Sequence, residues 1–276
     1  MRPTVLRRRA HFILGRAAVG LMSHQSGTHI MATGFNGFSP QTLTFLQQVR
    51  QQDSKEWFED HRQTYEDQLL TPFRALVDTL SIAMLQIDDH FETKPAVGKT
   101  LSRIHRDTRF SHDKSRYRDK MWFTFKRVHK DWTDAPTYFF ELTPTDWRYG
   151  LGYYSASRTT MELFRQTLRD NPPGFLKVAA CLGREFELVG ESYKRPLIKE
   201  QPAELAHWYN RKSFAVMATR QDQEPLFSGE LASVLAKGFT RLEPLYHYLM
   251  KIEAMKRAAE PEKISPAFLD EKWFSR

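Results

Sequence analysis

The chain has 276 residues, of which 41% are hydrophobic and 13% aromatic. That is enough apolar material for the core of one large domain or two small ones, and it excludes a chain that is disordered throughout. One cysteine, Cys181, excludes a disulfide framework and a cysteine-clustered metal site. The net charge is +8, but residues 1–31 hold five arginines and no acidic residue, which leaves 36 basic against 33 acidic residues in the rest. Nucleic-acid binders usually carry their excess charge on the folded domain, so the charge argues against that class.

Residues 1–33 are expected to be a disordered leader, or an over-long start assignment in which Met22 or Met31 is the true first residue. A transit peptide and an arm that touches nucleic acid or lipid are the alternatives for this arginine-rich, acid-free composition. No uncharged apolar run approaches the roughly 20 residues of a membrane span. We therefore expect no membrane contact and a cytoplasmic location.

Helical signals open the main part of the chain. Ser39-Pro40 is typical of an N-cap followed by proline at the first helical position, and apolar residues at helical spacing continue to about Gln52. Asp53 is expected to cap a second, long helix in a capping box. Pro72 should bend or restart that helix, which is predicted to stop at Asp88-Asp89.

The pattern then changes to short segments rich in aromatic and branched residues, separated by turn signals. The predicted strands are Leu101–Asp107, Met121–Val128, Thr137–Thr143 and Trp147–Tyr154. Short connections imply antiparallel neighbours. In the second strand the alternation places Met121, Phe123 and Phe125 on one face, and it places the following side chains on the other: Trp122, Thr124 and Lys126.

Helices return at Ser157–Arg169, at Phe175–Arg184 and from Ser228 to about Ala258, with one more strand expected at Phe214–Ala218. Helices, then strands, then helices predict an α+β fold, with an antiparallel sheet of four to five strands packed against N- and C-terminal helices. We expect one domain over residues 34–258, and a loosely attached tail at 259–276.

The stretch Arg103–Asp119 holds six cations and three carboxylates in seventeen residues. Its charges alternate with side chains that favour burial, namely Ile104, Phe110 and Tyr117. Charges tied to buried positions are held in place, as a ligand site requires. Arginine suits phosphate and carboxylate because its planar group donates two parallel hydrogen bonds. If 101–107 is a strand, Arg103, His105 and Asp107 share one face, and the next loop carries Arg109, Asp113 and Lys114.

The first hypothesis is a protein that binds a small anionic ligand, bearing phosphate or carboxylate. The expected ligand-binding residues are Arg103, Arg106, Arg109, Lys114 and Tyr117, with Asp107 and Asp113 orienting the cations. The second is a hydrolase or transferase on a phosphorylated substrate, with Asp107, Asp113 or Glu141 as general base. A third is a nucleic-acid-associated protein that adds Trp57 or Trp122. A fourth is an internal ion-pair lattice that pins a loop and binds nothing.

Other candidate sites are weaker. His105 and His112 lie beside carboxylates, but their spacing matches no defined site and the surrounding cations would repel a divalent ion, so no metal is expected. The standard nucleotide-binding loops do not occur, and we expect no cofactor. Gly150 and Gly152 are expected to let a backbone or a bulky side chain approach the sheet. Glu141 sits among apolar residues, where it is either a carboxyl of raised pKa or an outward-facing residue on a half-exposed strand.

The central motif resembles the widespread bacterial proteins of domain-of-unknown-function family 2461. The resemblance rests on the run from Arg103 to Arg118 and on Lys55-Glu56-Trp57-Phe58, with support at Gly150-Leu151-Gly152, Phe164-Arg165-Gln166 and Arg211-Lys212-Ser213-Phe214. It covers roughly residues 37–253 and implies a single cytosolic domain, without implying a reaction. Its hallmark positions fall here on Arg103, Arg106, Asp107, Arg109, Phe110, Asp113, Lys114 and Tyr117.

The chain departs from this family pattern at three positions. His105 stands where the family commonly has Tyr, His112 where it has Lys, and Arg116 where it has Pro. Both histidines of the motif are therefore departures, which argues further against a metal site and against histidine-based catalysis.

Overall fold

The computed structural model describes residues 34–109, 112–198 and 202–259. The predicted leader, nearly all of the predicted tail, and Phe110 of the charged motif lie outside these residues. The helices are α1 (Pro40–Gln52), α2 (Lys55–Asp60), α3 (Arg62–Tyr65), α4 (Thr71–Ile87), α5 (Arg158–Asp170), α6 (Pro172–Ala179), α7 (Ala203–Tyr209), α8 (Glu230–Arg241) and α9 (Glu243–Ala259). A π-helical turn η1 (Glu66–Leu70) and two 3-10 turns, η2 (Trp132–Asp134) and η3 (Ala180–Leu182), complete the helical elements. The strands are β1 (Met121–Phe125), β2 (Thr137–Leu142), β3 (Trp147–Gly152), β4 (Glu187–Val189) and β5 (Ala215–Arg220).

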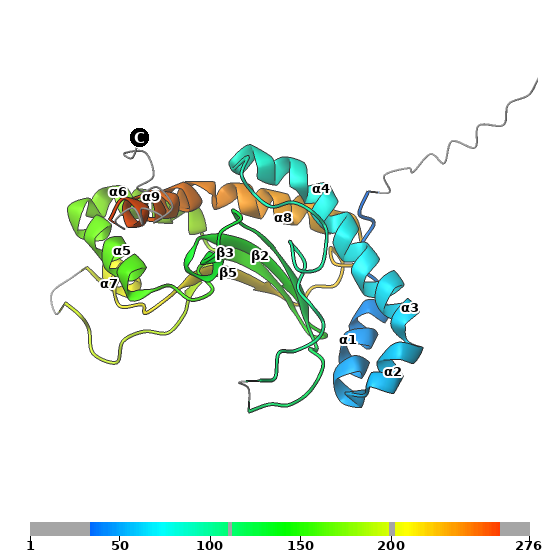
Figure 1. Ribbon diagram of the computed structural model, residues 1–276. Coiled ribbons are helices and arrows are strands. Elements are labelled where there is room, and N and C mark those ends of the chain that lie inside the picture. Colours follow the sequence, from blue (N-terminus) through cyan, green and yellow to red (C-terminus); the bar gives the residue numbers. More distant parts are fainter. Residues whose placement is uncertain (1–33, 110–111, 199–201, 260–276) are drawn as a thin grey trace, which may run out of the picture. The chain divides into compact units, whose positions relative to one another are not determined.

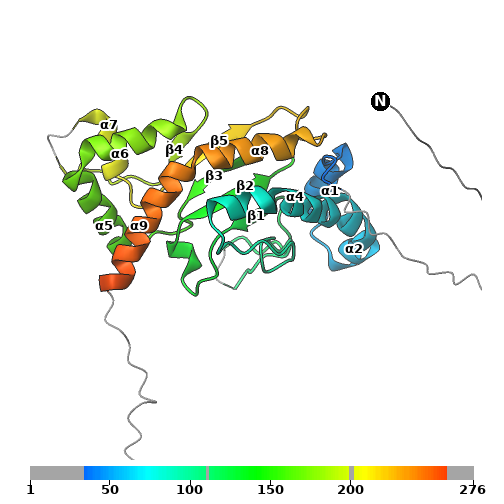
Figure 2. The same ribbon diagram turned by 90° about the horizontal axis from the view of Figure 1, so that it is seen from above.

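The strands form one five-stranded sheet in the order β1-β2-β3-β5-β4, and every neighbouring pair is antiparallel. This confirms the predicted α+β class with an antiparallel sheet. Helices α4 and α8 pack together, and both lie on the same face of the sheet (Figure 1, Figure 2). Helix α9, at the end of the described chain, packs on α5 and α6. None of the helices in the described ranges is long and apolar enough to cross a membrane.

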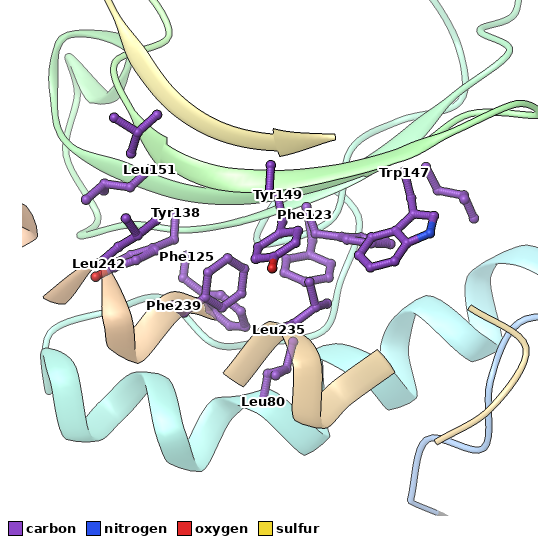
Figure 3. Close-up of a cluster of buried hydrophobic side chains, with 14 of the residues drawn as sticks. Leu80, Phe123, Phe125, Tyr138, Trp147, Tyr149, Leu151, Leu235, Phe239 and Leu242 are labelled. Carbon is purple, nitrogen blue, oxygen red and sulfur yellow. The ribbon is translucent and has the colours of Figure 1, made fainter. Parts of the chain in front are cut away.

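The core lies between the sheet and the α4–α8 pair (Figure 3). Alternate residues of each strand point into it, as the period of a strand requires. Phe123 and Tyr149 meet Leu80 of α4 and Leu235 and Phe239 of α8 there, and all five are at most 1% exposed. The predicted inward face of β1 is confirmed, because Met121, Phe123 and Phe125 are fully buried.

The glycines of β3 serve close strand packing. A Cβ on Gly150 would lie 1.9 Å from the carbonyl oxygen of Val216, and one on Gly152 would lie 2.4 Å from Cα of Ala215. Both contacts are with the backbone of β5, so any side chain at these positions would push the two strands apart. The expectation that these glycines admit a close neighbour is confirmed, and the neighbour is a strand backbone.

The predicted start of α1 is confirmed, since Ser39 accepts from the N–H of Thr42 and Pro40 opens the helix. The predicted second helix is confirmed in its restart at Pro72 and in its end at Asp88, but it is not continuous, because the chain forms α2, α3, η1 and α4. The break has a local cause at Pro72, which has no N–H to donate to the carbonyl of Gln68. The hydroxyl of Thr42 in α1 donates to that carbonyl at 2.6 Å, so the orphaned acceptor is satisfied from another helix.

The single final helix predicted from Ser228 is also wrong, since it divides into α8 and α9 at Leu242. The N–H of Leu242 donates to both Gly238 and Phe239 carbonyls, the pattern of a tightened helix end. Strand β4 and helix α7 are not predicted by the sequence. The three residues of β4 are too few for a visible alternation.

Candidate functional site

The charged motif forms an irregular hairpin. The predicted strand at 101–107 is wrong as a regular strand, because only isolated bridges join Leu101 to Phe123 and His105 to Tyr117. Backbone hydrogen bonds still hold the two arms side by side, from Arg106 N–H to the Arg116 carbonyl at 2.8 Å and from Arg118 N–H to the Ile104 carbonyl at 2.9 Å. The predicted alternation survives, with Arg103, His105 and Asp107 exposed and Ile104 buried.

A contact distant in sequence fixes the base of this hairpin. Asp53 was expected to cap a helix, but Ser54 does that by accepting from the N–H of Trp57. Asp53 instead adopts a left-handed backbone, with φ at 45°, and its carboxylate accepts from the N–H groups of Arg116 and Tyr117 at 2.6 and 3.2 Å. The joint between α1 and α2 therefore clamps the motif.

Tyr117 packs as a core residue at this base. Its side chain is 2% exposed and stacks on Phe58 of α2, with ring centroids 4.9 Å apart. The Trp57-Phe58 pair of α2 thus supports the motif through Phe58, while Trp57 stacks on His61 at 4.0 Å. Burial raises the pKa of the Tyr117 phenol. The ring of Tyr117 therefore lies in the core, next in sequence to Arg118.

Several charges of the motif are paired with one another. Asp113 accepts from Arg50 at 2.9 Å and lies 3.1 Å from Arg106. Asp107 accepts from the side chain of Arg109, with a shortest contact of 2.6 Å. Lys114 donates to the carbonyl oxygen of Thr108 at 2.8 Å. These contacts hold the loop between the two arms.

The hydrogen bonds to the two aspartates lower the pKa of both carboxyl groups. The Arg109 side chain and N–H lower the pKa of Asp107 to about 2. The Ser115 hydroxyl and N–H, aided by Arg106 and Arg50, lower the pKa of Asp113 to about 2. A carboxylate of so low a pKa takes up a proton poorly at neutral pH, so neither group is poised as a general base.

Glu141 lies on the face of β2 that points away from α4 and α8, which we call the open face of the sheet. Its carboxylate is 16% exposed and lies 2.9 Å from the Lys120 ammonium and 2.9 Å from Nε of Arg148. Glu141, the third candidate base, thus lies between two cations. Its side chain faces outward, which is one of the two arrangements that the sequence allowed.

Trp122 lies on the open face of the edge strand β1 and lines three adjoining cavities. The first, about 410 Å³, lies over the open face of β1 and β2 and is lined by Phe139, Trp132 and Arg118 among others. The second, about 310 Å³, includes Arg103, Thr124 and Lys126. The third, about 520 Å³, lies beside the motif and is lined by Arg103, His105, Arg106, Asp107, Thr108, Arg109, Arg118 and Trp122.

Two of the arginines in the third cavity have no carboxylate within ion-pair distance among the described residues. They are Arg103 and Arg118. Arg118 donates from one nitrogen to the carbonyls of Arg103 and His105, at 2.8 and 2.6 Å, and its guanidinium lies 4.9 Å from the Trp122 ring centroid. Burial lowers the pKa of Arg118 below its ordinary value and the neighbouring Arg106 lowers it further, which reflects a cation partly withdrawn from water.

Arg118 was absent from the sequence-predicted ligand set. The signal for it was the alternation itself. Since Tyr117 is buried, the next side chain points to the opposite side, where Trp122 lies.

A buried ionic cluster anchors the wall of the first two cavities. Lys256 of α9 donates to the carboxylate of Asp134 at 3.1 Å and to its carbonyl at 2.8 Å, and it lies 2.5 Å from Glu253. Asp134 in turn accepts from the N–H of Ser157 at 2.6 Å. Asp134 closes η2, so this cluster fixes the turn that carries Trp132.

The group of potential metal ligands in the described chain lies outside the three cavities. Within the described ranges, Asp88, Asp89 and His90 form the one group of at least three carboxylate or imidazole ligands close enough to share an ion. Asp88 already accepts from Arg127 at 2.7 Å and from the hydroxyl of Tyr246. The group lies at the end of α4, and none of its residues lines the three cavities.

The comparison with known families gives one match. Residues 41–248 match the model of the conserved hypothetical protein family DUF2461. A comparison with curated proteins gives no match. The matched range includes the whole sheet, the charged hairpin and every residue that lines the three cavities.

Proposed function

We propose that this protein, which belongs to the DUF2461 family of conserved hypothetical proteins, binds a small anionic ligand. The ligand bears a phosphate or carboxylate group. The anion lies in the cavity beside the charged hairpin, between Arg103 and Arg118. One observation carries the proposal. These two arginines line the same cavity and have no carboxylate partner among the described residues, while Asp107 and Asp113 are engaged by other cations.

The electrostatics of the cavity support this assignment. In the described part of the chain, four arginines and one carboxylate line it, so its field attracts an anion. Arg106 and Arg109 hold the loop through Asp113 and Asp107, and they add positive potential. Lys126, on the neighbouring cavity, donates to the hydroxyl of Thr124, and burial lowers its pKa. A partly desolvated cation gains more from an anion than a hydrated one does.

The proposal redistributes the roles expected from the sequence. Arg103 stays a ligand-binding residue, and Arg118 joins it. Arg106, Arg109 and Lys114 act mainly as supports of the loop, and Tyr117 acts as a core anchor. The engaged aspartates favour binding over a hydrolase or transferase mechanism that would use either as a base.

The test is calorimetric titration of the full chain with inorganic phosphate and with citrate. Arg103→Gln should weaken binding of the preferred anion roughly 10- to 100-fold, the value of one charge-assisted hydrogen bond of about 1.5–3 kcal/mol. Arg116→Gln is the matched control, because Arg116 is exposed on the same hairpin and lines none of the three cavities. Equal losses in both variants would mean that only net charge matters. No binding of either anion to the unmodified protein would refute the proposal.

A further inference from the structure

The cavity over the open face of the sheet has aromatic walls. Rings of Trp122 on β1, Phe139 on β2, Trp132 on η2 and Tyr154 after β3 line it. These side chains are only partly buried, and Tyr154 is 75% exposed. Large aromatic side chains gathered on one open face are unusual for a surface that binds nothing. The volume of about 410 Å³ falls in the range of small-molecule sites, about 300–1,000 Å³.

This cavity joins the proposed anion site through two shared residues. Arg118 and Trp122 line both the aromatic cavity and the cavity beside the hairpin. The Arg118 guanidinium lies over the Trp122 ring at 4.9 Å, so the cation and the aromatic wall form one continuous surface. A ligand whose charged group contacts Arg118 therefore places the rest of its body against the rings.

The rings favour a flat, delocalised group over a flexible chain. Trp132 lies 5.6 Å from Tyr154 between ring centroids, and the Lys126 ammonium lies 4.4 Å from the Trp132 centroid. Aromatic walls stack well on any planar ring, with a gain of about 1–3 kcal/mol per stacked base in nucleic-acid-binding proteins. An alkyl chain gains only the burial of its area.

The floor of the cavity also offers hydrogen bonds. Thr124 and Thr137 line it and are 7% and 5% exposed. The Thr124 hydroxyl accepts from Lys126, which leaves its proton to donate, and the Thr137 hydroxyl donates to the carbonyl of Ala135, which leaves its lone pairs to accept. A donor and an acceptor in an aromatic cavity suit the polar edge of a heterocycle.

We propose that the ligand is a free nucleotide-like compound, with its phosphate between Arg103 and Arg118 and its heteroaromatic ring in the cavity over the open face. This inference rests on the proposed anion site and adds the chemical class of the ligand. Phe139 is then a specificity residue, because it lines the aromatic cavity and neither of the other two.

The experiment compares four probes on the full chain by calorimetry: inorganic phosphate, ribose 5-phosphate, hexyl phosphate and AMP. AMP should bind at least tenfold more tightly than ribose 5-phosphate and hexyl phosphate. Phe139→Ala should remove that advantage while the affinity for inorganic phosphate changes less than twofold. Phe139→Leu keeps apolar volume without the ring and should lose most of the advantage too, which decides the question if the alanine variant does not fold. Ile82→Ala, on the exposed side of α4, is the control and should change nothing.

The outcomes separate the two proposals. If phosphate binds but AMP binds no better than ribose 5-phosphate, the nucleotide inference is wrong and the anion site stands. Equal affinities for AMP and hexyl phosphate would overturn the heteroaromatic ring in the same way. An AMP advantage that persists in Phe139→Leu would place the ring elsewhere. If none of the four probes binds, the anion site itself fails.

Discussion

Replacement of Asp53 tests whether the α1–α2 joint holds the charged hairpin in place. This residue has two separable roles, a left-handed backbone with φ at 45° and a carboxylate that accepts from the N–H groups of Arg116 and Tyr117. Asp53→Asn keeps an acceptor oxygen and a side chain that tolerates the left-handed region. Asp53→Gly keeps only the backbone conformation, and Asp53→Ala keeps neither.

The magnitudes follow from these contacts. Hydrogen bonds to a charged group contribute about 1.5–3 kcal/mol when buried, and the contact with Arg116 is exposed, so the carboxylate as a whole should contribute about 1–2 kcal/mol. The left-handed backbone adds about 1–2 kcal/mol for alanine. Expected losses in free energy of unfolding are therefore below about 1 kcal/mol for Asn, about 1–2 for Gly and about 2–4 for Ala.

The assay is urea unfolding followed by tryptophan fluorescence and by circular dichroism, with the phosphate affinity of each folded variant measured beside it. Phosphate affinity should fall in the same order as stability, because the clamp sits one residue from Arg118. A glycine variant as stable as the unmodified protein would refute the clamp. The hydrogen bonds of the Asp53 carboxylate would then contribute nothing to stability. An alanine variant no worse than glycine would refute the strain.

Three further changes probe the sheet, the hairpin and the buried ionic cluster. Gly150→Ala should destabilise the protein by at least about 1–3 kcal/mol in urea unfolding, because its Cβ would lie 1.9 Å from the Val216 carbonyl oxygen. The pKa of Asp113 is lowered from 3.8 to about 2. The contribution of this carboxylate to stability is therefore present above pH 4 and is lost as the pH falls toward 2. Asp113→Asn should flatten the stability–pH profile between these two pH values. Lys256→Met removes the cation beside the buried Glu253 carboxylate and the partly buried Asp134 carboxylate and should cost about 3–5 kcal/mol, measured as a fall in the urea midpoint.

Each of these has a matched control on the same chain. Gly34→Ala adds the same methyl group in open space and should be neutral, whereas an equal loss there would discredit the steric argument. Asp119→Asn removes an exposed carboxylate at the foot of the same hairpin and should leave the acid limb unchanged. Lys251→Met removes an exposed ammonium from the same helix, and a loss as large as that of Lys256→Met would show that burial of the cluster is immaterial.

The alternation of side chains predicted the strands and their faces well. The segment Met121–Phe125 shows why, since Met121, Phe123 and Phe125 are fully buried in the core while Trp122 and Thr124 take the opposite face. Helix boundaries were less predictable, because they depend on distant partners. Asp53 has the local features of a helix cap, and only a contact with residues 63 and 64 positions away draws its carboxylate elsewhere.

The sequence pointed to the charged hairpin as the candidate site, but it did not identify Arg118 as one of its residues. Charge density singled out the hairpin, but the sequence does not distinguish an arginine that pairs with a nearby aspartate from one that has no carboxylate within ion-pair distance. Arg109 and Arg103 have the same chemistry, and they differ because the Asp107 carboxylate folds back on Arg109. The aromatic cavity needs tertiary structure, because Trp132 joins Trp122 and Phe139 only through a turn held by Lys256, over a hundred residues later.

The loose pairing between the charged hairpin and β1 has a consequence for the behaviour of the protein at high concentration. The hairpin arm occupies the outer edge of β1 at intervals, with Thr124 N–H bound to the Thr100 carbonyl and Trp122 N–H bound to the Ser102 hydroxyl. The opposite edge is β4, which is only three residues long. Exposed strand edges with a continuous row of free backbone groups recruit other chains into aggregates. Neither end of this sheet offers a long continuous row over the described residues, so the segment that lines the cavity beside the hairpin should also disfavour intermolecular strand addition.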